Sequence, residues 1–146
     1  MIEHFPFGMP RVPTSKVVLR EPSGNIVLVA GKSGRHNLVG GEIEPGETAL
    51  DALWREMEEE LGLSAQYVRN VRSIGRFMQP VVPIGRDPYK AAWRVHTGDL
   101  IAPVQEMIPG NEIQHAVAWS AEKILSPPPD KVVSRLAQRA VRMSIR

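Results

Sequence analysis

The chain contains no cysteine, and this absence excludes several kinds of site. Disulfide bonds, thiolate zinc centres and cysteine nucleophiles are ruled out, so any metal must be bound by oxygen or imidazole ligands. No stretch approaches the roughly 18 apolar residues that a membrane span needs. Residues 1–13 (MIEHFPFGMPRVP) lack the basic and apolar regions of a secretion signal. We therefore expect a cytoplasmic protein without a membrane partner.

The composition is that of a globular protein. Hydrophobic residues make up 42% of the 146 residues and charged residues 23%. No internal repeat is present, and low complexity is limited to residues 127–129. A chain of this length can bury a core as one domain. We expect a single domain over residues 1–146, in which the proline-containing residues 1–13 form an irregular arm.

Charge is distributed unevenly along the chain. Residues 41–63 hold eight of the sixteen acids and a single base, Arg55. The remaining residues carry seventeen lysines and arginines against eight acids, a net charge of +9. An acidic segment within a basic protein suits a site that binds divalent cations beside a polyphosphate. For any single basic side chain, a role in solubility is the more common explanation.

The pattern of apolar residues, glycine and proline predicts a mixture of strands and helices. Strands are expected over residues 16–21, 26–30, 67–78, 91–100 and 116–119. Helices are expected over residues 48–61, 120–125 and 131–143. Residues 31–46 form a glycine-dense loop, and Gly62 stands where a helix C-cap glycine belongs. Mixed strands with few helices indicate an α/β sandwich.

The helix expected over residues 48–61 gathers three acids on one side. At about 100° per residue, Glu56, Glu59 and Glu60 share a face. The neighbouring arc is apolar and should pack against the sheet; it contains Leu50, Leu53, Trp54, Met57 and Leu61. The three carboxylates therefore lie at the edge of a packed face, whereas Glu58 points away from them.

Three carboxylates in one place repel each other unless they are protonated or bound to a cation. Oxygen donors of this kind are the ligands that Mg²⁺ and Mn²⁺ prefer. A run of glutamates is, however, more often a solvated helix face than a metal site. The metal interpretation therefore needs a second signal.

That signal comes from the residues that precede the helix. Gly41 lies six residues before Glu47, which lies eight before Arg55. The segment GEIEPGETALDALWREMEEELGL, residues 41–63, resembles the Nudix hydrolase signature: glycine, five residues, glutamate, seven residues, then Arg-Glu-aliphatic-any-Glu-Glu-any-Gly-aliphatic. With seven fixed residues at roughly one in fifteen usage, a chance match is on the order of 10⁻⁸ per start position. We refer to residues 41–63 as the Nudix box.

The resemblance implies a fold and a metal site. Members of the family are α/β/α sandwiches with a mixed central sheet. By position in the box, Glu59 and Glu60 correspond to the principal metal ligands, and Glu56 to a further ligand or the general base. The main-chain carbonyl of Gly40 is a candidate additional ligand. The implied cofactor is Mg²⁺ or Mn²⁺.

The resemblance also implies roles for two residues beside the acids. Glu47 either holds the metal cluster through water or orients the loop, and Arg55 pairs with Glu56 or Glu47 to fix a rotamer. An ordinary helix salt bridge is the alternative for Arg55. Some members place the general base on a loop near the late strand. Glu112 is the best candidate there and Glu106 the second, and either is otherwise a solvated loop acid.

The sequence says less about the substrate pocket. Arg76 and Arg94 flank the expected cleft and are candidates to bind phosphate, although each is also consistent with a surface charge. Trp93, Phe77 and Tyr89 suit either base stacking or, as strand aromatics commonly do, the core.

Family members hydrolyse a diphosphate linkage, most often in a nucleoside diphosphate joined to a further group. The leading expectation is a small-molecule substrate such as ADP-ribose or a nucleotide sugar. The alternatives are hydrolysis of nucleoside or deoxynucleoside triphosphates, a non-catalytic nucleotide-binding module, and a pyrophosphohydrolase of RNA 5′ ends. The intact box argues against a non-catalytic module. No RNA-binding motif is present, so a nucleic-acid partner is not expected. A homodimer is consistent with the family.

Overall fold

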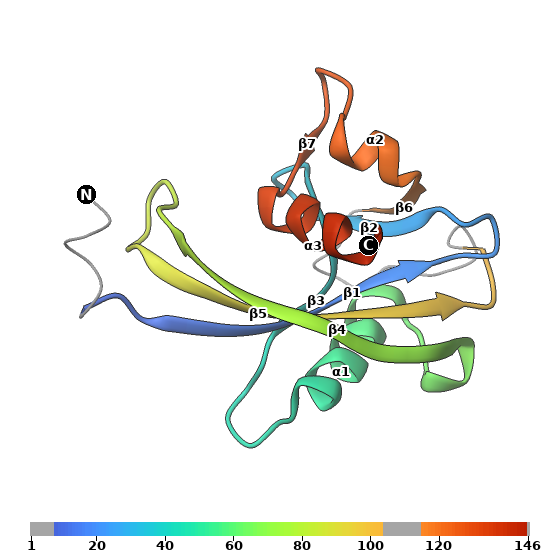
Figure 1. Cartoon of the computed structure of the whole chain (residues 1–146), viewed down its shortest axis with the longest axis horizontal. Coiled ribbons are helices and arrows are strands. Elements are labelled where there is room, and N and C mark those ends of the chain that lie inside the picture. The colour runs from blue at the N-terminus through green and yellow to red at the C-terminus, as the bar shows by residue number, and fades with distance from the viewer. Residues whose placement is uncertain (1–7, 104–114, 146) are drawn as a thin grey trace.

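The structure, a computed structural model, describes residues 8–103 and 115–145. A mixed sheet of seven strands forms the centre, with α1 on one face and α2 and α3 on the other (Figure 1). This arrangement confirms the α/β/α sandwich with a mixed sheet. The strands are β1 (Arg11–Arg20), β2 (Ile26–Ala30), β3 (Arg35–Glu42), β4 (Val68–Val81), β5 (Tyr89–Leu100), β6 (His115–Trp119) and β7 (Val132–Val133). The helices are α1 (Ala49–Leu61), α2 (Ala121–Leu125) and α3 (Arg135–Ile145), with a 3₁₀ turn at Ala65–Tyr67.

The sheet has the order β4-β5-β1-β2-β3-β7, and β6 pairs with β2. Strand β1 runs parallel to β5 along its whole length and β7 runs parallel to β3, whereas the other pairs are antiparallel. On the edge opposite β5, β1 pairs with two strands. Its last residue, Arg20, pairs with β2, and residues 14–17 pair with residues 39–42 of β3. This division brings the middle of β1 against the glycines of β3.

Three sequence-based boundaries are wrong, each because a strand is longer or present where none was expected. Residues 35–42 form β3 inside the expected glycine-rich loop, since they pair with both β1 and β2. Residues 11–13 belong to β1 and not to an irregular arm, because β5 pairs with them. Residues 132–133 pair with β3 as β7, so the final helix starts at Arg135 and not at residue 131.

Two further differences concern the strand that follows α1 and its partner β5, which begins at Tyr89 and not at residue 91. Strand β4 extends to Val81, since Pro80 and Val81 pair with Lys90 and Tyr89. Proline can occupy this position because β4 lies at the edge of the sheet. The loop expected from residue 80 is accordingly shorter.

The core is divided by the sheet into two parts. One lies between the sheet and α2 and α3 and includes Val18, Leu38, Phe77 and Trp93. The other lies between the sheet and α1 and includes residues from β1, β2 and β3 together with Leu53, Met57 and Leu61. Side chains alternate along β1, so Val17 and Leu19 face α1 whereas Val18 faces α3.

Helix α1 has well-formed ends. Thr48 is the N-cap and shares a reciprocal capping box with Asp51, a motif worth about 1 kcal/mol. Gly62 ends the helix in the left-handed conformation, with φ of 66°. The helix buries Leu53, Met57 and Leu61 as expected, but Leu50 is 43% exposed. Leu50 lies in the first turn of α1 and is not part of the core cluster on that face.

Candidate active site

The carboxylates of α1 approach the sheet at two consecutive glycines of β3. The backbone N–H of Gly40 donates a hydrogen bond to Glu60 Oε1 at 2.7 Å. A Cβ atom on Gly41 would lie 2.5 Å from Glu56 Oε1, so only glycine leaves room for that carboxylate. Gly40 has φ of 131°, and a Cβ on it would lie 2.1 Å from the carbonyl oxygen of Ser15. The two glycines therefore allow α1 to pack closely on the face of β3 and β1 to pair closely along its edge.

Arg55 organises the acidic side chains around it. Its Nε donates to Glu47 Oε2 at 2.9 Å and one terminal nitrogen donates to Glu56 Oε1 at 2.8 Å. The other terminal nitrogen donates to the carbonyl of Glu42 at 2.9 Å. The expected pairing of Arg55 is thus present with both Glu56 and Glu47. These contacts raise the pKa of Arg55, so the guanidinium stays charged.

Glu47 connects the loop before α1 to this arginine. Its Oε1 accepts a hydrogen bond from the backbone N–H of Glu44 at 2.8 Å and another from Arg55 at 3.1 Å. The hydrogen bond from Arg55 lowers the pKa of Glu47, which keeps its carboxylate ionised. Of the two roles left open for Glu47, this geometry matches orientation of the loop.

The remaining acids differ in their surroundings. Burial raises the pKa of Glu60 to about 7, against the opposing effects of Lys16 and the Gly40 N–H. Burial also raises the pKa of Glu56, and the hydrogen bond from Arg55 opposes that shift. The side chain of Glu59 is 58% exposed and lies 3.4 Å from Arg55. Two acids at this site are therefore costly to ionise, and the third is open to solvent.

Oxygen donors with excess negative charge suit a divalent cation, and the residues here fit one. Glu56 and Glu60 are drawn into low-dielectric surroundings, where a bound cation would favour their charged forms. The hydroxyl of Ser15 is buried without a hydrogen-bond partner and faces the α1 side opposite Gly41, beside these carboxylates. Within the described residues, no three acids or histidines are yet arranged around one point. Arg55 contacts Glu56 and Glu59, whereas the Gly40 N–H contacts Glu60.

The carbonyl of Gly40, the additional metal ligand that the resemblance implied, has a partner in the protein. Lys16 Nζ donates to it at 2.9 Å and to the carbonyl of Leu38 at 3.1 Å. Lys16 is buried in β1, and burial lowers its pKa while Glu60 and Glu56 oppose the shift. Lys16 was not among the predicted site residues. In the sequence it is an ordinary strand residue directly before the apolar run Val17–Leu19.

A cavity of about 610 Å³ lies beside these residues on the α3 side of the sheet. Lys16 and Gly41 line one part of it, and Tyr89 and Trp93 line another. Asn37, Gln79, Arg35 and Arg135 add polar and cationic groups to its wall. Glu56, Glu59 and Glu60 do not line this cavity, but its wall includes Gly41, against which Glu56 packs. A cavity with cations and an aromatic side chain on its wall, adjoining an acidic helix at one glycine, suits a nucleotide with a polyphosphate group.

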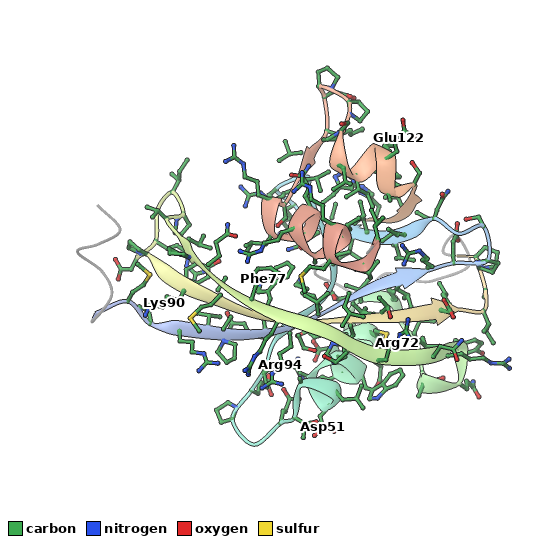
Figure 2. All side chains as sticks on the ribbon, viewed as in Figure 1. Asp51, Arg72, Phe77, Lys90, Arg94 and Glu122 are labelled. Atoms are coloured by element: carbon green, nitrogen blue, oxygen red, sulfur yellow. The ribbon has the colours of Figure 1, made fainter. Side chains whose placement is uncertain are left out.

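The predicted substrate residues Arg76 and Arg94 lie elsewhere. They are facing partners on β4 and β5 and line a second cavity of about 420 Å³. Arg94 lies on the α1 side of the sheet, whereas Phe77 lies on the side of α3 (Figure 2). The aromatic residues behave as expected of strand positions, because Phe77 and Trp93 are buried in the core. Glu112 and Glu106 lie outside the described residues.

The sheet topology and the acidic helix packed on paired glycines together define a class of α/β/α-sandwich hydrolases. The chain matches the family model described as NUDIX domain over residues 10–138. It therefore belongs to the NUDIX domain family and is a Nudix hydrolase, an enzyme that acts on phosphoanhydride bonds. Enzymes of this family generally use divalent metal ions and act on small nucleotides.

Solved structures share the fold at low sequence identity. The MutT protein of Methanosarcina mazei Go1 is 18% identical with a TM-score of 0.74, covering 94% of this chain and 96% of that one. The E. coli dihydroneopterin triphosphate pyrophosphohydrolase is 16% identical with a TM-score of 0.70, covering 92% and 94%. A C. elegans Ap4A hydrolase is 14% identical with a TM-score of 0.68, covering 92% and 95%.

A comparison with curated protein sequences finds no significant match. Within the described residues, no helix has both the length and the apolar character that crossing a membrane requires.

Proposed function

We propose that this Nudix hydrolase cleaves the diphosphate linkage of a nucleoside diphosphate derivative, such as ADP-ribose or a nucleotide sugar, with Mg²⁺ or Mn²⁺ as cofactor. The observation that carries the proposal is the position of the 610 Å³ cavity, whose wall includes Gly41, the glycine against which Glu56 packs. A diphosphate at this end of the cavity would lie beside the acids. Tyr89, which is half-buried at the cavity wall, offers aromatic surface for a base or sugar.

Glu56, Glu59 and Glu60 are the residues that would hold the cation. A divalent ion supplies neutralisation of phosphate oxygens and a lower pKa for bound water. Arg55 contributes by fixing Glu56 through a hydrogen bond of 2.8 Å, and Glu47 contributes by fixing Arg55. Each of these contacts orients a carboxylate before substrate arrives, so less reorganisation is needed during the reaction.

Glu56 is the general base in this proposal. Its carboxylate would take a proton from the water that attacks phosphorus, while the P–O bond to the leaving phosphate breaks. Burial raises the pKa of Glu56, and a base is most effective when its pKa lies near the working pH. Glu112 is the alternative base that the sequence offers. Glu56→Gln and Glu112→Gln would distinguish them, since the loss of the base lowers kcat by about 10²–10⁴-fold.

Cations around the cavity are suited to the substrate's phosphates. Arg35 and Arg135 line the same cavity as Lys16. We propose them as phosphate contacts ahead of Arg76 and Arg94, which line the separate cavity on β4 and β5. Arg35→Gln and Arg76→Gln form a matched pair for this assignment. The first should raise KM, and the second should leave KM unchanged.

The test of the function is release of phosphate and nucleotide from a panel of ADP-ribose, nucleotide sugars, nucleoside triphosphates and dinucleoside polyphosphates, each with Mg²⁺, Mn²⁺ or chelator. We expect turnover of a diphosphate derivative that chelator abolishes. Preferred turnover of a triphosphate would instead favour the triphosphate pyrophosphohydrolase alternative. Metal-independent turnover would contradict the proposal.

Glu59→Gln is the control variant for the panel because it keeps side-chain volume and removes one charge. Turnover should fall by about 10³-fold or more, since a ligand of the catalytic cation is lost. The variant should fold at least as stably as the original chain in chelator, because repulsion within the cluster is relieved. Retention of full turnover would show that Glu59 is not at the site.

A further inference from the structure

Lys16 is the one buried lysine or arginine among the described residues. It lies in the middle of β1 and is 7% exposed. Its neighbour along the strand on the same face, Val18, belongs to the core under α3. Burying an ammonium group is costly unless its hydrogens find acceptors. A charge retained at such a position calls for a specific role.

The ammonium group is held by backbone and not by carboxylates. Its hydrogen-bond partners are the carbonyls of Leu38 and Gly40, at 3.1 Å and 2.9 Å. Within the described residues, Lys16 has no carboxylate within ion-pair distance, although Glu60 and Glu56 act on it electrostatically. The positive charge therefore lies next to the acidic cluster without taking up any of its oxygens.

Lys16 also faces the cavity. It contributes to the wall of the 610 Å³ cavity, and its Nζ lies 5.5 Å from the centre of the Trp93 ring. An ammonium group has three hydrogens, and the two carbonyls use two of them. One hydrogen remains for a group that enters from the cavity.

A divalent ion and an ammonium group at the same carbonyl repel each other strongly at these distances. Mg²⁺ bound to the carbonyl oxygen of Gly40 would lie roughly 2.0–2.1 Å from it, whereas Lys16 Nζ lies 2.9 Å from it. Lys16 is anchored by a second carbonyl, by burial, and by a backbone that pairs with β5 and β3. The lysine is therefore placed to exclude a divalent ion from this ligand.

We propose that Lys16 is a built-in cation that replaces a divalent ion at the carbonyl of Gly40. Divalent ions then bind to Glu56, Glu59 and Glu60 without the main-chain ligand, and Lys16 supplies fixed positive charge for a substrate phosphate in the cavity. The inference rests on the proposed metal-dependent function. Its consequence is that this enzyme binds fewer divalent ions, or binds them more weakly, than its carboxylates alone would allow.

The experiment is a titration of the metal-free protein with Mn²⁺. Binding is measured by calorimetry and, separately, by the electron paramagnetic resonance signal of free Mn²⁺. Lys16→Met keeps most of the length of the side chain and removes the charge. Lys32→Met removes one charge from an exposed turn and serves as the matched control. We expect Lys16→Met to gain a Mn²⁺ site or to bind Mn²⁺ at least tenfold more tightly. Lys32→Met should change affinity less than twofold.

If the original chain and Lys16→Met bind Mn²⁺ with equal stoichiometry and affinity, the inference is overturned. Mn²⁺-dependent turnover in that case would leave the proposed function standing. Absence of Mn²⁺ binding by both proteins would overturn the proposed function together with the inference. Circular dichroism of each variant establishes that the proteins compared are folded.

A crystal structure of the unmodified chain with Mn²⁺ tests the inference even if Lys16→Met does not fold. The anomalous difference map should place Mn²⁺ on the glutamates, with Lys16 Nζ still within hydrogen-bond distance of the Gly40 carbonyl. A Mn²⁺ peak coordinated by that carbonyl, with Lys16 displaced, would overturn the inference.

Discussion

At the scale of single residues, the acids of the Nudix box are not equivalent. Glu60 is the most affected by burial, which raises its pKa to about 7. Glu59 is largely exposed, and Glu56 is held by Arg55. The same residue type therefore occupies three electrostatic environments within five positions. The differences come from what β1 and β3 place against each side chain.

The raised pKa of Glu60 predicts how stability depends on pH in the metal-free protein. The folded state binds a proton at Glu60 more tightly than the unfolded state does between about pH 4.5 and 7. Stability should therefore fall as pH rises through this window, by up to about 3 kcal/mol. Glu60→Gln should lack this part of the fall. Urea unfolding at pH 5 and pH 8 in chelator measures it, and parallel pH profiles for the two proteins would refute the assignment.

Arg55 predicts a loss of activity that exceeds the loss of stability. Arg55→Lys keeps the charge but cannot contact Glu47, Glu56 and the Glu42 carbonyl together. We expect kcat to fall by about 10–100-fold, the usual effect of removing a group that orients ligands. Arg69→Lys, at an exposed position of β4, is the control and should retain kcat. A normal kcat in Arg55→Lys would reduce this contact to an ordinary salt bridge.

At the scale of elements, the site depends on how closely α1 packs against β3. The capping box and the left-handed Gly62 fix the two ends of α1, and its apolar residues fix its rotation. Glu56 and Glu60 then reach the backbone of β3, where glycine leaves space. A helix with the same acids packed against a strand with larger side chains would hold them farther from the sheet.

The two glycines of β3 predict different outcomes for the same substitution. In Gly41→Ala, the new Cβ meets the end of the flexible Glu56 side chain, at 2.5 Å from Oε1. The carboxylate can move aside, so we expect overpacking to lower stability by only about 1 kcal/mol but kcat to fall at least tenfold. In Gly40→Ala, the Cβ meets the backbone of Ser15 at 2.1 Å with φ of 131°, and the fold itself should be lost or severely destabilised.

Urea unfolding and kcat measured on both glycine variants check this contrast. Similar effects of the two substitutions on stability would contradict it. Full activity in Gly41→Ala would show that the position of Glu56 does not limit turnover.

At the scale of the whole molecule, the sheet separates the proposed metal ligands from the proposed substrate cavity. The acidic helix lies on one face, and the large cavity lies on the face covered by α3. The division of β1 between β2 and β3 allows the two to meet at Gly40 and Gly41. Lys16 lies at the same junction from the cavity side.

This arrangement predicts that a divalent ion stabilises the whole fold. Binding of Mg²⁺ or Mn²⁺ at 100 times its Kd should add about 2.7 kcal/mol to the free energy of unfolding. For a chain of this size, the Tm should rise by roughly 5–10 °C. At a fixed ion concentration the increase should be larger at pH 8 than at pH 5, because Glu60 has to lose its proton to bind the ion and the Kd is therefore lower at pH 8. Thermal denaturation with ion and with chelator measures the effect. Glu59→Gln should show a smaller rise, and an equal rise would contradict the assigned ligands.

The sequence alone determined the features that depend on local spacing. The Nudix box, the helix over its second half and the ends of that helix all follow from residues close together in the chain, so they could be predicted. The resemblance of the box also predicted that Arg55 pairs with Glu56 or Glu47, and the structure has both contacts. The fold class followed from the box and from the order of strands and helices.

Tertiary structure alone decided the features that depend on distant segments. Strand β3 is extended although it is rich in glycine, because β1 and β2 pair with it. The environment of Glu60 depends on Gly40 and Lys16, which lie 20 and 44 positions earlier in the sequence. Lys16 is unremarkable in the sequence and acquires its position when β1 pairs with β3. The burial and the electrostatic environment of a residue depend on all the residues near it in space. Many of those residues are distant in the sequence, so a local sequence pattern does not identify them.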